Sequence, residues 1–204
     1  MRYEANPFIA RSGWFTLGTF TLIALVLWRA AGFVYAAPLA LAALLVAFKF
    51  RDPDRPVPSS RLGVVAPVDG RVLSVRRVED GPFGTAALKV RLRVSPFTIY
   101  GVRSPIEGTV SDPATFCAAS GTLRGFCLRT DEGDAMLMRM EHYGIGAPKA
   151  KVNIGQRLGH GERCGSVRLA HTVEIFLPPT AIARVQSHDP AEAGVTVLAE
   201  FAPH

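Results

Sequence analysis

Residues 161–179, GERCGSVRLAHTVEIFLPP, contain a Gly-Ser step just before a run typical of a buried strand. A Gly-Ser bond in this position is where some enzymes cleave their own chain. The serine hydroxyl attacks the glycine carbonyl, and elimination of the resulting ester leaves a pyruvoyl group. Ser166 is therefore a candidate nucleophile, and Gly165 is the residue before the bond that would be cleaved.

The other residue types that carry chemistry do not show the spacing of a metal site. The three cysteines, Cys117, Cys127 and Cys164, are odd in number and lack a C-x-x-C pair, which favours a reducing compartment. The histidines outside the stretch above also lack metal-ligand spacing and are expected at the surface: His142, His160, His188 and His204. Neither a metal nor an added cofactor is predicted from these residues.

The overall composition indicates a membrane-associated protein with an anionic partner. Of the 204 residues, 49% are hydrophobic, and the mean hydropathy of +0.22 is high for a fully soluble protein. The net charge is +6, yet the sequence has no zinc-finger spacing, recognition helix or aromatic-basic platform for nucleic acid. Basic residues beside a membrane segment are attracted to acidic headgroups, so anionic lipid is the better partner.

An apolar region over residues 14–48 is predicted to anchor the chain in a membrane. Arg29 is its only charged residue and separates apolar runs of 15 and 19 residues. Because a full span needs roughly 20 residues, these runs favour a transmembrane helical hairpin within residues 1–50 that turns near residues 29–32. A single span, a cleaved signal peptide and a shallow re-entrant hairpin remain open. Basic residues flank both outer ends, which predicts that both ends are cytoplasmic: Arg2, Arg11, Lys49, Arg51 and Arg55.

A Pro-rich, charged linker over residues 51–60 separates this anchor from a predicted β domain over residues 61–204. Strands are expected over residues 71–78, 86–94, 126–130, 135–140, 172–177 and 195–201. Gly and Pro interrupt them at short intervals. The predicted fold class is therefore mainly β, a compact β barrel or sandwich-like domain preceded by the helical hairpin.

The strand predicted over residues 86–94 has one buried and one basic face, because apolar and polar residues alternate with period two. Lys89, Arg91 and Arg93 share the basic face with Ala87. This face is either solvated or in contact with anionic headgroups. The residues expected on the buried face are Ala86, Leu88, Val90, Leu92 and Val94.

Four stretches in this order resemble the short, bacterial-type phosphatidylserine decarboxylases: FKFRDPDRPVP at 48–58, APVDGRV at 66–72, SPFTIYGVRSPIEGTV at 95–110 and GERCGSVRLAHTVEIFLP at 161–178. The resemblance implies a membrane phospholipid substrate and a pyruvoyl group that the chain makes from its own serine. That ketone would form a Schiff base with the substrate amine and act as the electron sink for decarboxylation. An Asp-His pair would activate the serine. The expected location is the bacterial cytoplasmic membrane, with the β domain on its cytoplasmic side.

The sequence departs from this family at the position of the cleaved bond. When Gly161 and Gly165 on one side and Leu177 on the other are matched without a gap, the family's Gly-Ser falls on Ala170-His171. Ser166 lies five residues earlier, roughly 16 Å away in an extended chain and on the opposite face. We therefore expect Ser166 to be an ordinary turn serine.

The other residues that the family uses are also largely replaced. The resemblance places the general-base histidine on Tyr100, whose phenol, with an ordinary pKa of about 10, is a poor base at neutral pH. Asp69 keeps the family identity, whereas an Ala-Arg-Arg run is replaced by Ile145, Gly146 and Ala147. His171 has no hydroxyl from which a pyruvoyl can form, although it is able to bind a phosphate or transfer a proton.

Three functional hypotheses follow from these departures. The first is a membrane-anchored family member that does not process itself and binds anionic phospholipid or a membrane enzyme of lipid metabolism, with homo-oligomers possible. The second is an active phosphatidylserine decarboxylase that uses the displaced Ser166 or a different mechanism. The third is an enzyme of another class that acts on a lipid with Asp69, Tyr100 and His171.

Overall fold

The chain divides into two compact units, Met1–Asp54 and Arg55–His204. The computed structural model describes residues 11–49, 55–60, 62–95, 101–111, 125–142, 149–166 and 170–202. Tyr100 and the run Ile145–Ala147 therefore lie outside the described residues.

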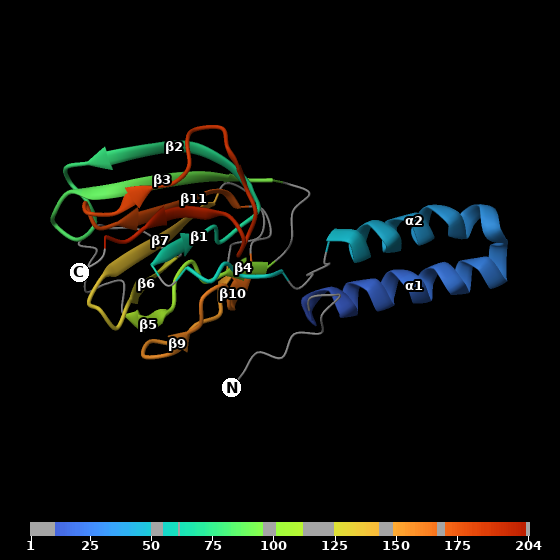
Figure 1. Cartoon of the computed structure of the whole chain (residues 1–204). Coiled ribbons are helices and arrows are strands. Elements are labelled where there is room, and N and C mark those ends of the chain that lie inside the picture. The colour runs from blue at the N-terminus through green and yellow to red at the C-terminus, as the bar shows by residue number, and fades with distance from the viewer. Residues whose placement is uncertain are drawn as a thin grey trace. The chain divides into compact units, whose positions relative to one another are not determined.

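The first unit contains helices α1, Arg11–Ala31, and α2, Phe33–Lys49, which lie side by side and antiparallel (Figure 1). The turn between them is at Gly32, whose φ of 93° is in the left-handed region that favours glycine. Its N–H donates to the carbonyl of Trp28 (3.2 Å), which closes the last turn of α1. The predicted helical pair is thus present, with the turn in the expected place.

The predicted transmembrane character of this pair is not supported. Among the described residues, neither helix combines the length and the apolar character that a membrane crossing requires.

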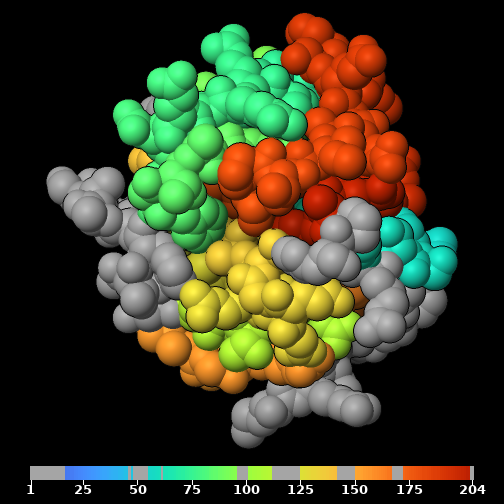
Figure 2. Space-filling model, turned by 60° about the vertical axis from the view of Figure 1, so that its left-hand side comes forward, coloured from blue at the N-terminus to red at the C-terminus, as the bar shows by residue number. Residues whose placement is uncertain are grey.

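The second unit is built from antiparallel β-sheet, which confirms the mainly β prediction. An eight-stranded sheet has the order β13-β2-β3-β11-β7-β6-β5-β9, and two three-stranded sheets have the orders β1-β14-β12 and β4-β10-β8. Neighbouring strands of the large sheet come from distant parts of the sequence. In Figure 2, segments of different colour, and so of different residue number, therefore lie next to one another on the surface. The strands of the large sheet are β13 Pro190–Ala191, β2 Gly70–Val78, β3 Ala87–Val94, β11 Ala170–Leu177, β7 Ala135–His142, β6 Gly125–Arg129, β5 Gly108–Ser111 and β9 Arg157–Leu158. Those of the small sheets are β1 Gly63–Val65, β14 Val197–Glu200, β12 Ile182–Ala183, β4 Gly101–Arg103, β10 Arg163–Ser166 and β8 Lys149–Ala150.

The main core lies between the inner face of the large sheet and the two small sheets. Leu88, Val90 and Leu92 of β3 are almost fully buried in it, as their alternation predicts. Val64 of β1 and Leu198 of β14 belong to the same cluster. Burial of such side chains stabilises the fold by about 1.5–3 kcal/mol each.

The period-two prediction for β3 needs one correction at its start. Ala86 precedes the strand and is exposed, whereas Ala87 is buried. Ala87 packs in a second apolar cluster with Cys127, Leu137 and Phe176. This cluster lies on the face of the large sheet opposite to the main core, so one end of that face is apolar and not solvated.

We call this opposite side of strands β2, β3, β11 and β7 the outer face. It carries Lys89 and Arg91 as predicted, but both are paired with acids that the pattern did not reveal. Glu174 of β11, only 2% exposed, lies 2.7 Å from Lys89 Nζ and 3.4 Å from Arg91 Nε. Arg91 also pairs with Glu141 of β7, with Nη2 3.0 Å from Oε2. The centre of the predicted basic face is therefore largely neutralised.

Candidate functional site

The stretches that resemble the decarboxylases lie against one another in the fold. Backbone N–H groups of Arg103 and Ser104 donate to the carbonyls of Pro67 (2.9 Å) and Glu162 (2.7 Å). The N–H of Gly161 donates to the Ser104 carbonyl (3.0 Å). Motifs separated by tens of residues in the sequence thus form one hydrogen-bonded region.

The chain after Arg55 joins the same region. Gly161 has a φ of 70°, and a Cβ built on it would lie 2.5 Å from Val57 Cγ2. Only glycine therefore permits both the left-handed turn and the close approach of Val57. The GER stretch and the end of the predicted linker are packed together by this contact.

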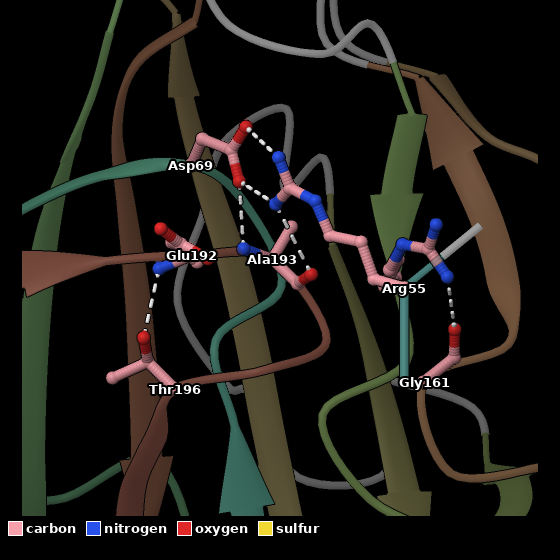
Figure 3. A network of polar contacts seen from close by, with 7 residues as sticks. Arg55, Asp69, Gly161, Glu192, Ala193 and Thr196 are labelled. Carbon is pink, nitrogen blue, oxygen red and sulfur yellow. Dashed lines mark hydrogen bonds and ion pairs between the residues drawn. The ribbon is translucent and has the colours of Figure 1, made fainter. Parts of the chain in front are cut away.

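Asp69, which the resemblance identifies as the orienting acid, lies in this region and is held by Arg55 (Figure 3). Arg55 Nη1 donates to Oδ1 and Nη2 donates to Oδ2 (3.1 Å) in a bidentate pair. The backbone N–H of Ala193 also donates to Oδ1 (2.7 Å). The Arg55 and Asp69 side chains are 20% and 17% exposed, so the pair is partly shielded from water. The Asp69 carboxylate thus connects the start of the unit, the start of β2 and the segment before β14.

The sheet register brings two of the predicted site positions to one end of the large sheet. The N–H of Ser95 donates to the Asp69 carbonyl (3.2 Å), and Arg93 pairs with Thr172. Positions 69 and 171 are therefore about two strand spacings apart, roughly 10 Å. The β11–β7 register shifts between Ala170 and Thr172, so His171 is the extra residue of a β-bulge. Bulges commonly occur beside functional sites.

Ser166, the alternative nucleophile, lies in a different sheet. It is the last residue of β10, the central strand between β4 and β8, and its neighbours across the ladder are Gly101 and Lys149. Ser166 is 6% exposed. It is therefore a buried strand residue and not the turn serine that the sequence suggested, and Gly165 before it is paired on both sides.

The structure thus joins part of the predicted site. Asp69 and the backbone of His171 share one sheet end, whereas Gly165 and Ser166 lie in a small sheet. The contribution of Arg55 was not predicted. It belongs to the quoted RDPDRPVP stretch, but no local pattern indicates that it reaches an acid 14 residues away.

Comparisons with known proteins agree with the family that these motifs resemble. Residues 42–199 match the family model described as phosphatidylserine decarboxylase. The chain belongs to the phosphatidylserine decarboxylase family. It is 36% identical to a phosphatidylserine decarboxylase proenzyme of Nitrosomonas eutropha, in an alignment that covers 98% of both chains. It is 31% identical to a phosphatidylserine decarboxylase proenzyme of Ralstonia nicotianae, in an alignment that covers 96% of this chain and 97% of the relative. Among solved structures, the glucose permease IIA from Mycoplasma capricolum aligns with 68% of this chain and 94% of its own at 17% identity. The TM-score of this alignment is 0.46, so no conclusion is based on it.

Membership of the phosphatidylserine decarboxylase family has direct chemical consequences. The family uses a pyruvoyl group derived from its own chain and no external cofactor, and its substrate is a phospholipid. A pyruvoyl arises from a serine, so the residue at the cleaved position decides whether this chain can form one. Among the described residues, no group of His, Cys, Asp and Glu is arranged to hold a metal ion.

A pocket of about 350 Å³ lies beside the same region and is lined in part by His160, a histidine predicted to lie at the surface. His160 is half-buried, and its Nε2 has no hydrogen-bond partner. Burial lowers the pKa of His160, although the Glu107 carboxylate and the carbonyls of Pro105 and Gly63 oppose that shift. Among the other residues that line the pocket, Arg157 Nη2 lies 3.0 Å from Glu107 Oε1 and 2.6 Å from Asp131 Oδ2.

The lowered pKa of His160 predicts a pH-dependent stability. The unfolded chain takes up the proton first as the pH falls below about 6.5, so the free energy of unfolding decreases from that pH down to the pKa in the folded state. In the His160→Gln variant we expect the free energy of unfolding to decrease less than in wild type as the pH falls below this value. Denaturant unfolding of both proteins between neutral and mildly acidic pH measures it, with His188→Asn as the exposed control. Equal slopes in wild type and His160→Gln would contradict the assignment.

Proposed function

We propose that this chain is a membrane-anchored member of the phosphatidylserine decarboxylase family that does not form the pyruvoyl group and acts by binding phospholipid. The observation that carries the proposal is the position of Ser166, which is 6% exposed in a strand that is paired on both sides. Asp69, whose two oxygens accept hydrogen bonds from Arg55 and one also from Ala193, contributes to the fold of the same region.

The residues around the cleavage position support the same proposal. The family resemblance puts Ala170 and His171 where a glycine and a serine are required. Ser166 is buried within a central strand, and the adjacent Gly165 is part of a regular ladder on both sides. Attack on the Gly165 carbonyl would require this paired segment to leave its sheet. Neither position offers the hydroxyl and the accessible carbonyl that self-cleavage needs.

The exposed surface of the helical pair supports membrane anchoring. Many large apolar side chains of α1 and α2 face outwards, and such a continuous apolar surface is unfavourable in water. We propose that the pair enters the bilayer as a hairpin without crossing it as two spans, at the bacterial cytoplasmic membrane with the β unit on the cytoplasmic side. The exposed residues are Leu22, Ile23, Leu25, Val26, Trp28, Phe33, Val34, Tyr35, Leu41, Leu44 and Leu45.

The mass of the intact chain tests the absence of self-processing. We expect the purified, detergent-solubilised protein to give one species near 22.0 kDa, without reactivity towards a ketone reagent and without release of carbon dioxide from phosphatidylserine. The Ser166→Ala and His171→Ala variants are the controls and should give the same pattern.

Cleavage before residue 166 or 171 would overturn the proposal. It would favour the alternative function, an active phosphatidylserine decarboxylase. An intact chain that turns over lipid and loses this activity in His171→Ala would instead favour an enzyme of another class. Binding of phospholipid by an intact, inactive chain is the result expected here.

A further inference from the structure

The excess positive charge of this protein is concentrated on the outer face of the large sheet. Over β2, β3, β11 and β7, this face carries six basic side chains and two acidic ones, which leaves four of the chain's six net positive charges there. The acidic residues are Glu141 and Glu174. The basic residues are Arg71, Arg76, Lys89, Arg91, Arg93 and Arg139.

The two acids do not neutralise the whole face. Both lie in the network with Lys89 and Arg91. Arg71, Arg93 and Arg139 are exposed, and none of the three forms an ion pair within the described part of the chain. The face therefore contains a neutral centre and a cationic margin.

Two of these arginines are direct neighbours. Arg71 of β2 and Arg93 of β3 are partners in the antiparallel ladder. Like charges directly opposite each other on one sheet face destabilise it, because their side chains lie close together. An anion that binds both guanidiniums removes this repulsion, and planar guanidiniums suit phosphate oxygens.

The position of this pair also fits a lipid surface. Thr172 of β11 is the ladder partner of Arg93 and directly follows His171 in the chain. The arginine pair therefore lies near His171, at the sheet end that contains Asp69. We infer that Arg71 and Arg93, with Arg139 of β7 on the same face beyond β11, dock the β unit on phosphate groups of an anionic membrane. The inference rests on the proposed lipid-binding function and specifies the surface that performs it.

Vesicle binding by the full chain tests the inference. The partition coefficient is measured on vesicles of phosphatidylcholine alone and on vesicles that also contain phosphatidylglycerol. The apolar hairpin contributes to both partition coefficients. The ratio of the coefficient with phosphatidylglycerol to that without it therefore reports the electrostatic contribution to binding. One basic residue near an anionic surface changes binding about fivefold, and we expect Arg93→Gln to lower the ratio by that factor and Arg71→Gln/Arg93→Gln by about 25-fold. High salt should bring the wild-type ratio close to that of the double variant.

The matched control is Arg77→Gln. Arg77 is an exposed arginine of β2, but its ladder partner is Leu88, so it lies on the side of the core residues. The charge change is the same, and we expect the ratio to stay near wild type. Equal losses in Arg77→Gln and Arg93→Gln, or an equal loss on phosphatidylcholine alone, would overturn the inference. A change of oligomeric state in place of vesicle binding would also overturn it. These outcomes are independent of the intact mass, which tests self-processing.

Discussion

Replacement of both Lys89 and Arg91 by methionine is expected to destabilise the β unit by about 3 kcal/mol, because it leaves the buried Glu174 carboxylate without its cations. Breaking a buried pair costs about 3–5 kcal/mol in general. The lower value applies because Arg139 is the ladder partner of Glu174 on β7 and can approach it. Denaturant unfolding, followed by the circular dichroism of the sheet, measures the loss.

The control removes the charge that has lost its partners. In Lys89→Met/Arg91→Met/Glu174→Leu, three apolar side chains replace the network beside Phe176, over whose ring Lys89 Nζ lies at 5.1 Å from the centroid. We expect stability within about 1 kcal/mol of wild type, because well-packed apolar residues can replace a buried ionic cluster. If the triple variant is as unstable as the double variant, packing and not charge burial explains the loss.

Replacement of Asp69 by alanine is expected to cost about 3 kcal/mol. It removes the bidentate partner of Arg55 and the acceptor of the Ala193 N–H, and hydrogen bonds that involve a charged group contribute about 1.5–3 kcal/mol. Asp69→Asn retains an acceptor for Ala193 and should lose about half as much. Unfolding measurements on both variants separate the ion pair from the backbone hydrogen bond.

A second readout distinguishes this structural role from a catalytic one. In Asp69→Asn the segment after Arg55 is no longer fixed by charge, so trypsin should cleave faster than in wild type at the end of this segment, after Arg61. Arg55→Gln and the double variant Arg55→Gln/Asp69→Asn should be about equally unstable, since each removes the same pair. Asp69→Asn with wild-type stability and wild-type trypsin resistance would show that Asp69 does not act as a structural link.

Features that depend on local pattern were determined by the sequence. The alternation in residues 88–92 predicts the buried side of β3, because successive side chains of a strand point to opposite faces. The apolar runs around Arg29 predict two helices and their turn. Four motifs in order imply the family, which the comparisons confirm.

Several sequence-based expectations failed where long-range contacts decide the outcome. The basic pattern of β3 does not reveal Glu174, which lies on a strand more than 80 residues later and reaches Lys89 only through the ladder. His160 was expected at the surface, but it is half-buried and interacts with the backbone of Gly63 and Pro105, both more than 50 residues earlier in the chain. Ser166 was expected in a turn, but two neighbouring strands make its segment the centre of a small sheet.

The state of the candidate site is likewise a property of the tertiary structure. The sequence determined that Asp69 is present and that Ala170 and His171 stand where the family resemblance places the cleaved bond. Only the tertiary structure decided that Asp69 is bound by Arg55 and Ala193, because this geometry joins three distant segments. Residue identity limits the chemistry that a position can perform, whereas packing determines which partner it contacts.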